Sequence, residues 1–226
     1  MAVHLRREIE NLKKEILTLG TMVELAVREA TAAIGDRDEA TARRIIDNDL
    51  QIDEMEVQVE ESCLKILALH QPVAIDLRFI IAALKINNDL ERVGDLAVNV
   101  AERAAFLATQ PPVSISLDFQ AMAHKAQGML TKSLDALVNL SASQALEVLA
   151  GDDEIDAMNR QMYVIIQQAI GARPEQTESL IHMLSASRHI ERIADHATNI
   201  AEDVIYMIEG TIVRHKAEDY KPQIRS

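Results

Sequence analysis

Pairs of acidic residues spaced four apart recur along this chain, and each pair has a counterpart about one hundred residues away. On a helix, residues i and i+4 lie on the same face, so each pair presents two carboxylates together. Carboxylate oxygens are the ligands that hard cations prefer. The pairs therefore predict metal binding. The candidate ligands are Asp49, Asp53, Glu91, Asp95, Asp152, Asp156, Glu191 and Asp195.

One fourteen-residue segment returns, weakly edited, one hundred residues later, with no insertion or deletion between the copies. The two copies are Asp89–Glu102 and His189–Glu202, and both keep a Glu-x-x-x-Asp pair. Such self-similarity is typical of a duplicated structural unit. The chain is therefore expected to contain two similar halves, each with its own acidic pairs.

The acidic pairs of each half are placed so that they can face each other across a helical hairpin. Asp53 and Glu91 lie equally far from Pro72, where a helix is expected to end, and the other two acids of that half are centred on the same residue. The acids of the second half are centred just before Pro174. Because each helical residue rises by about 1.5 Å, the four carboxylates of each half come level on neighbouring helices. Carboxylates this close repel one another unless protons or cations intervene.

An all-carboxylate site favours hard divalent or trivalent cations such as iron, manganese, magnesium or calcium; zinc is a further candidate and copper is disfavoured. No Glu-x-x-His occurs, so the ligand signature of ferritin-like di-iron enzymes is missing. The alternative is a solvated acidic face, which is common on long helices. His182, His189 and His196 repeat every seven residues, and we expect them to line a packing face between halves or subunits, with metal ligation as the alternative.

The elements that must position these acids follow from the spacing of apolar residues. From Leu5 to Ile34 apolar residues recur every three or four positions, which indicates a long helix. Asp38 is an expected N-cap for the next helix, and Gln71-Pro72 and Pro174 mark turns. No stretch alternates with the period of a half-buried strand. The expected helices cover about 3–34, 38–70, 76–108, 117–140, 143–171 and 174–210.

The predicted fold is all-α, with two tandem, pseudo-symmetric three-helix bundles. The first bundle is expected at residues 1–109 and the second at 115–211, with an irregular C-terminal tail at 212–226. A proline-containing linker, Gln110–Ser114, separates the bundles.

Composition excludes several classes of protein. The formal net charge of −13 argues against nucleic acid as a partner, because binding phosphate groups requires a basic surface. The single cysteine, Cys63, is expected in the core and suits a reducing compartment. The N-terminus lacks the apolar run of a signal peptide, and the longest apolar stretch, Phe79–Leu84, is too short to span a bilayer. A cytoplasmic location without direct membrane insertion is expected.

Other catalytic signatures are missing from the sequence. It has no glycine-rich phosphate loop, no Gly-x-Ser-x-Gly elbow and no paired-cysteine zinc motif. We therefore expect a protein that is not an enzyme. Two alternatives stay open: a carboxylate-bridged multinuclear metal protein with enzymatic or storage activity, and a metal-free helical scaffold.

The motifs that surround the acids resemble those of the PhoU family, the accessory and regulatory proteins of phosphate-specific transport. The resemblance covers nearly the whole chain except the tail. The second copy has Ala194 where the family commonly has the glycine found at Gly94. The residues that carry the resemblance are Leu19–Glu24, the Gln71-Pro72 turn before Asp76-Leu77-Arg78, Leu90–Asp95 and Ile190–Ile200.

The resemblance implies two three-helix bundles with metal clusters on the Glu/Asp-x-x-x-Asp motifs, which map onto the eight acids named above. It also implies a cytoplasmic homodimer that negatively regulates the phosphate-starvation response. The partners it implies are the ATPase of the phosphate ABC transporter, PstB, and the sensor histidine kinase PhoR. From these expectations, the chain is predicted to repress starvation signalling and high-affinity phosphate uptake as a metal-binding adaptor.

Overall fold

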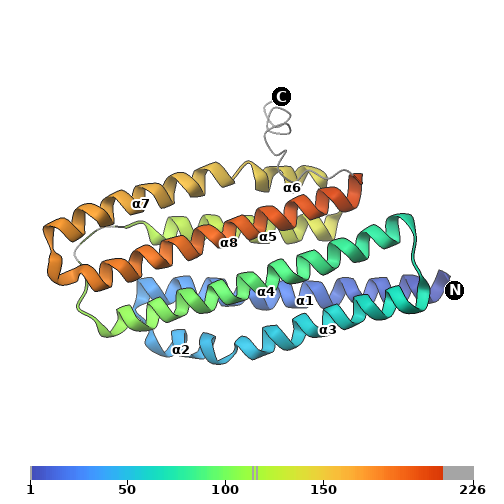
Figure 1. The fold of residues 1–226 in the computed structure, drawn as a ribbon, viewed down its shortest axis with the longest axis horizontal. Helices are drawn as coiled ribbons and strands as arrows, with labels where there is room; N and C mark the ends of the chain where they lie inside the picture. The colour runs from blue at the N-terminus through green and yellow to red at the C-terminus, as the bar shows by residue number, and fades with distance from the viewer. Residues whose placement is uncertain (1, 114, 116, 211–226) are drawn as a thin grey trace.

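The computed structural model describes residues 2–113, 115 and 117–210, and this part of the chain folds into helices without a β-strand (Figure 1). The predicted all-α fold with two similar three-helix halves is confirmed. The predicted tail at 212–226 lies outside the described residues. The helices are α1 (Ala2–Asp36), α2 (Glu39–Asp47), α3 (Asp49–His70) and α4 (Ala74–Thr109), then α5 (Phe119–Asn139), α6 (Ala142–Leu149), α7 (Asp152–Ala172), a 3₁₀ turn (Pro174–Gln176) and α8 (Thr177–Glu209).

Two of the predicted helices are each broken in the structure, and the prediction of single helices there was wrong. The expected helix 38–70 is interrupted at Asn48, whose backbone N–H donates to the carbonyls of both Arg44 and Ile45. The expected helix 143–171 is interrupted at Ala150 and Gly151. Asparagine and glycine are both poor interior helix residues. Each break leaves the two pieces in sequence along one side of the bundle, so the three-rod plan of each half survives.

At the ends of α2, α3 and α4 the structure has the capping and turn residues that the sequence predicts. Asp38 caps α2, because its carboxylate accepts a hydrogen bond from the N–H of Thr41 at 3.0 Å. Gln71 adopts a left-handed conformation with φ of 45° and ends α3 immediately before Pro72. Asp76 lies in the first turn of α4, as expected. The hairpin that must bring the two acidic pairs together is therefore present.

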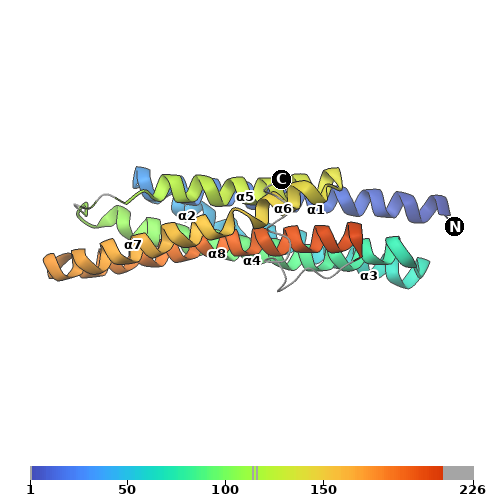
Figure 2. The same ribbon diagram turned by 90° about the horizontal axis from the view of Figure 1, so that it is seen from above.

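The eight helices form an elongated molecule in which the two halves lie side by side. Figure 2 shows α1 and α5 on one side of the molecule and α4 and α8 on the other. Within each half the long helices pack as α1 on α4 and α5 on α8, and the halves are joined by α4 against α8 and α1 against α5. One continuous cluster of buried apolar side chains includes residues of both halves. The duplicated units therefore share a core.

The α4–α8 contact between the halves is partly polar. The two helices run antiparallel, since Phe106 stacks on His182 while Asp89, nearer the start of α4, accepts from His196, which lies further along α8 than His182. The centroids of the stacked rings are 3.7 Å apart, and the His196 Nδ1 to Asp89 Oδ1 distance is 2.7 Å. Asn199 also donates to Asp89. The prediction that the histidines line a packing face between halves or subunits is confirmed for His182 and His196, which contact the other half.

Within the described ranges, no helix combines the length and the apolarity that crossing a membrane would require. Cys63 is buried in the core as expected, and its burial raises the pKa of the thiol to about 12.

Candidate metal centres

The break before α3 places the first acids at the beginning of a helix. Asp49 is the first residue of α3, and Asp53 lies one turn further along. Glu91 and Asp95 lie in the middle of α4, on the other arm of the same hairpin. We call these four residues the first cluster. The break before α7 has the same effect on Asp152, and the second cluster is Asp152, Asp156, Glu191 and Asp195.

The acids of the first cluster lie close enough to perturb one another across the hairpin. Partial burial raises the pKa of Asp49, and the negative charges of Asp53 and Asp95 raise it further. Burial likewise raises the pKa of Glu91, with Asp95, Glu56 and Asp53 adding to the effect. The structure therefore brings the α3 acids and the α4 acids together. This agrees with the predicted position of the four carboxylates at the same level of the two helices. Binding of a cation by these carboxylates stays a prediction.

A neighbouring guanidinium offsets part of this charge. Arg92 Nε lies 3.4 Å from Glu91 Oε2, and Arg92 Nη1 lies 3.8 Å from Asp95 Oδ2. Arg92 lowers the pKa of Glu91, against the larger effects of burial and Asp95. The side chain of Arg92 is 55% exposed, so Arg92 is a surface residue whose guanidinium lies beside these carboxylates. Its long flexible side chain can turn back along α4, and the charge of the motif favours that conformation.

The second cluster shows the strongest perturbation. The Asp195 side chain reaches solvent, yet neighbouring helices desolvate its carboxyl, and the charges of Glu191, Asp152 and Asp156 act in the same direction. Together they raise the pKa of Asp195 to about 6, although His196 opposes the shift. In this half, Arg160 Nη1 lies 3.3 Å from Asp156 Oδ2 and neutralises part of the charge.

Replacement of Asp195 by asparagine is therefore expected to stabilise the metal-free protein. The folded-state pKa of about 6 exceeds the usual value of 3.8, so ionisation of Asp195 destabilises the fold as pH rises between these values. The gain of Asp195→Asn is expected to be absent below about pH 4 and complete above about pH 6. After allowance for solvent screening of this exposed group, it should be on the order of 1 kcal/mol. Urea unfolding in the presence of EDTA at several pH values measures it. A variant no more stable than wild type at pH 7.5 would contradict the expectation.

Two buried oxygens test whether the first cluster suits a cation. Asp49 Oδ1 and Glu91 Oε2 are removed from solvent and accept no hydrogen bond within the described structure. Buried carboxylate oxygens without a donor are costly, and a hard cation would satisfy them. As the side chains are oriented, however, no three His, Cys, Asp or Glu residues of the described ranges converge closely enough to hold a metal ion. The chemistry of the residues fits a cation, and binding requires the side chains to adopt other conformations.

A hydrogen bond beside each cluster was missed by sequence reasoning. Asn87, buried on α4, donates to Glu56 Oε1 at 3.0 Å and also to the Glu56 carbonyl. At the corresponding place in the second half, Ser187 donates to Asn159 Oδ1 at 3.0 Å. Because Asn87 and Ser187 are one hundred residues apart, the duplication was the signal that could have found them. The first cluster thus has an additional carboxylate beside it, whereas the second has a neutral amide.

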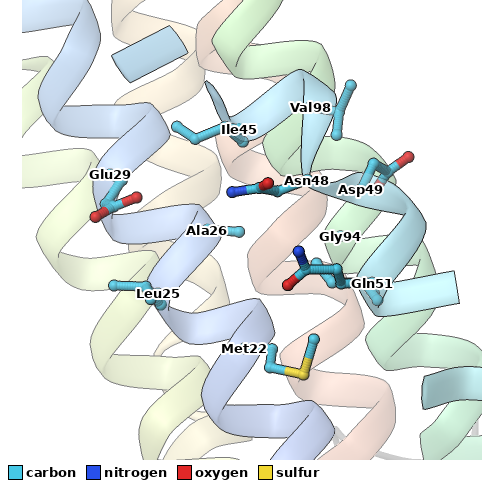
Figure 3. Close-up of a pocket in the computed structure, with 11 residues that line it drawn as sticks. Met22, Leu25, Ala26, Glu29, Ile45, Asn48, Asp49, Gln51, Gly94 and Val98 are labelled. Atoms are coloured by element: carbon cyan, nitrogen blue, oxygen red, sulfur yellow. The ribbon is translucent and has the colours of Figure 1, made fainter. Parts of the chain in front are cut away.

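A small cavity of about 120 Å³ adjoins the first cluster at the break between α2 and α3 (Figure 3). Its lining is mainly apolar, and its two acids are Asp49 and Glu29, which lie on opposite sides in Figure 3. Glu29 is already paired with Arg44 at 3.1 Å. Gly94 forms part of the wall, and a Cβ added there would lie only 3.1 Å from Ile52 Cγ2. The cavity therefore adds no second free carboxylate for a cation at Asp49.

Comparisons with known proteins give a consistent result. The family model described as the PhoU domain matches residues 16–104 and 119–204. A phosphate-specific transport system accessory protein PhoU homolog from Caulobacter vibrioides is 33% identical over 90% of this chain and 89% of its own length. A homolog of the same name from Aquifex aeolicus is 35% identical over 93% of this chain and 95% of its own. The crystal structure of PhoU from Pseudomonas aeruginosa is 35% identical, covers 91% of this chain and 99% of its own, and has a TM-score of 0.89.

Proposed function

The chain belongs to the PhoU family, and from that membership we propose that it is a non-enzymatic accessory protein of a phosphate-specific transport system. The observation that carries the proposal is the match of both halves to the family model, together with relatives of that printed name along nine-tenths of the chain. The helical scaffold, with a core shared by both halves, suits a protein that acts through its surfaces.

In finer terms, the proposed role is negative regulation. When phosphate is plentiful, the protein restrains high-affinity phosphate uptake and the phosphate-starvation response. It does so in the cytoplasm as a homodimeric adaptor between the transporter ATPase and the sensor histidine kinase. Its long exposed helices and its strongly negative charge support a role in protein contacts and argue against a nucleic-acid partner.

The two carboxylate clusters are proposed to hold divalent or trivalent cations, among them iron, manganese, magnesium or zinc. Asp49, Asp53, Glu91 and Asp95 would supply the oxygens in the first half, and the corresponding acids would do so in the second. A bound cation supplies positive charge that relieves carboxylate repulsion. The raised pKa values of Asp49, Glu91 and Asp195 support this, since they record repulsion and desolvation that the protein alone does not offset.

Deletion of the gene tests the regulatory role. In phosphate-rich medium, cells without the protein are expected to lose repression of alkaline phosphatase and to take up phosphate faster, because the restraint on both is removed. Phosphatase activity and uptake of radiolabelled phosphate measure the two effects. A plasmid copy of the wild-type gene should restore repression, and phosphate-starved cells provide the induced reference. If repression in rich medium survives the deletion, the regulatory proposal is wrong.

A further inference from the structure

The outer face of α3 carries three large apolar residues at seven-residue intervals. Leu50, Val57 and Leu64 expose 69%, 50% and 54% of their surface, whereas the opposite face of α3 buries Ile52 and Val59 in the core. We call the three exposed residues the apolar stripe. Residues seven apart lie nearly above one another on a helix, so the three side chains form one line that a second helix can contact along its length. Their alignment on one face, with acidic residues beside them, distinguishes them from the other exposed apolar residues of the described structure.

No described helix covers this face. The helices packed against α3 are α1, α2 and α4, and Figure 1 shows α3 along the outer edge of the molecule. The stripe is not needed for folding either, because the duplicated half forms the same hairpin without it. Counted from the first acid of each helix, the positions of the stripe correspond on α7 to the polar residues Asp153, Arg160 and Gln167.

Acidic side chains flank the stripe on both sides. At about 100° per residue, Glu54 and Glu61 lie on one side of it, and Asp53 and Glu60 lie on the other. All four are exposed. An anionic membrane surface would be repelled by these acids, and a second copy docked α3 against α3 would set like charges against each other. Lysine and arginine on either side of an apolar seam would complement them.

We propose that the apolar stripe of α3 is the docking site for a basic amphipathic helix of a partner protein. The stripe runs from Leu50 to Leu64, which is about 21 Å of helix, so a partner helix of roughly 15–20 residues covers it. Its apolar seam packs on Leu50, Val57 and Leu64, and its flanking lysines or arginines face the glutamates. The proposal concerns a surface separate from the cation ligands, apart from Asp53. It rests on the proposed regulatory role, for which it names a partner surface.

Binding of a synthetic peptide tests the surface directly. The probe is a fluorescein-labelled peptide of roughly 21 residues, with leucine at the seam positions and lysine beside them. Full-length wild-type protein is expected to bind it, measured by fluorescence anisotropy at 0.15 M salt. The triple variant Leu50→Asp, Val57→Arg, Leu64→Gln, which installs the residues of the second half, should bind at least about tenfold more weakly because it lacks the apolar anchors.

Two controls separate docking from general charge attraction. A peptide of the same composition, scrambled so that its leucines do not align, should bind much more weakly than the ordered peptide. A variant changed on α7, Arg160→Ala with Gln167→Ala, should bind as wild type does. Circular dichroism and the melting temperature establish that each variant is folded. Equal binding of ordered and scrambled peptides, or of wild type and the triple variant, would overturn the proposal.

Analytical ultracentrifugation tests the alternative that the stripe binds a second copy of this chain, because it measures the oligomeric state of wild type and of the triple variant. If the triple variant changes the oligomeric state, the stripe is a self-association surface and the proposal is wrong. The regulatory role is tested separately by the wild-type gene in deletion cells. A wild type that fails to restore repression defeats that role and leaves peptide binding informative, whereas a triple variant that restores it fully counts against the docking site alone.

Discussion

A hard cation is expected to raise the melting temperature of the protein by several degrees after it has been freed of metal with EDTA and the chelator removed. A ligand that binds the folded state alone stabilises it by about 2.7 kcal/mol at one hundred times its dissociation constant. For a chain of this size, 1 kcal/mol corresponds to roughly 2–4 °C, so one filled site should add about 5–10 °C. Mn²⁺ is a suitable first probe because it accepts carboxylate ligands, and differential scanning fluorimetry measures the shift.

The physical reason lies in the carboxylates that the hairpins hold together. Asp49 Oδ1 and Glu91 Oε2 are buried and accept no hydrogen bond, although Arg92 Nε lies 3.4 Å from Glu91 Oε2. The pKa of Asp195 is raised to about 6. Without a cation, these groups destabilise the fold at neutral pH. A cation reverses the sign of that contribution, so amide substitutions in one cluster should stabilise the metal-free protein and remove that cluster's share of its response to Mn²⁺. The amide variants should therefore be more stable than wild type without metal and less stable than wild type with Mn²⁺, and this reversal distinguishes cation binding from other effects.

The first-cluster variant combines Asp49→Asn, Asp53→Asn, Glu91→Gln and Asp95→Asn. It should lose that cluster's share of the Mn²⁺ response while the second cluster still responds. The matched control removes four exposed acids elsewhere: Glu54→Gln, Glu61→Gln, Asp135→Asn and Glu175→Gln. The control should respond as wild type does. An equal response from both variants would show that Mn²⁺ acts as a diffuse counter-ion, and the proposal of cation sites would fail.

Much of the architecture could be predicted because it depends on apolar periodicity. The apolar residues that recur from Leu5 to Ile34 form the buried face of α1. Asp38, Pro72 and Pro174 lie where the chain reverses direction. The meeting of the acids followed from counting residues outward from those reversals. The breaks at Asn48 and Gly151 could not be found in this way, because the apolar face continues on either side of each break.

The details of the clusters depend on side-chain conformation, which periodicity does not determine. Arg92 can point away from its helix or back along it, and only the surrounding charge decides between these conformations. Asn87 contacts Glu56 because two helices pack at one particular height and rotation. Lys85 and Asp203 meet across the two halves, 118 residues apart, and no local pattern connects them.

Replacement of Lys85 by methionine is expected to destabilise the protein by about 2–3 kcal/mol. Asp203 on α8 is only 3% exposed, and its Oδ1 lies 2.9 Å from Nζ of Lys85 on α4. The ammonium also lies 5.1 Å from the centre of the Tyr206 ring. Removal of one member of a buried ion pair typically costs about 3–5 kcal/mol, because a buried charge loses its counter-charge. The side chain of Lys85 is 40% exposed, so water reaches the site and reduces the cost.

A double variant, Lys85→Met with Asp203→Leu, separates the pair from simple loss of packing. Replacement of both charges by apolar groups of similar size should recover most of the lost stability, since an ion pair often contributes little over such a pair. Urea unfolding, followed by circular dichroism and checked for a single transition, measures all three proteins. A cost below about 0.5 kcal/mol for Lys85→Met, or a double variant less stable than the single one, would show that the pair is unimportant. Because α4 and α8 share one core, a true loss here should weaken both halves together, and the unfolding transition should move without splitting.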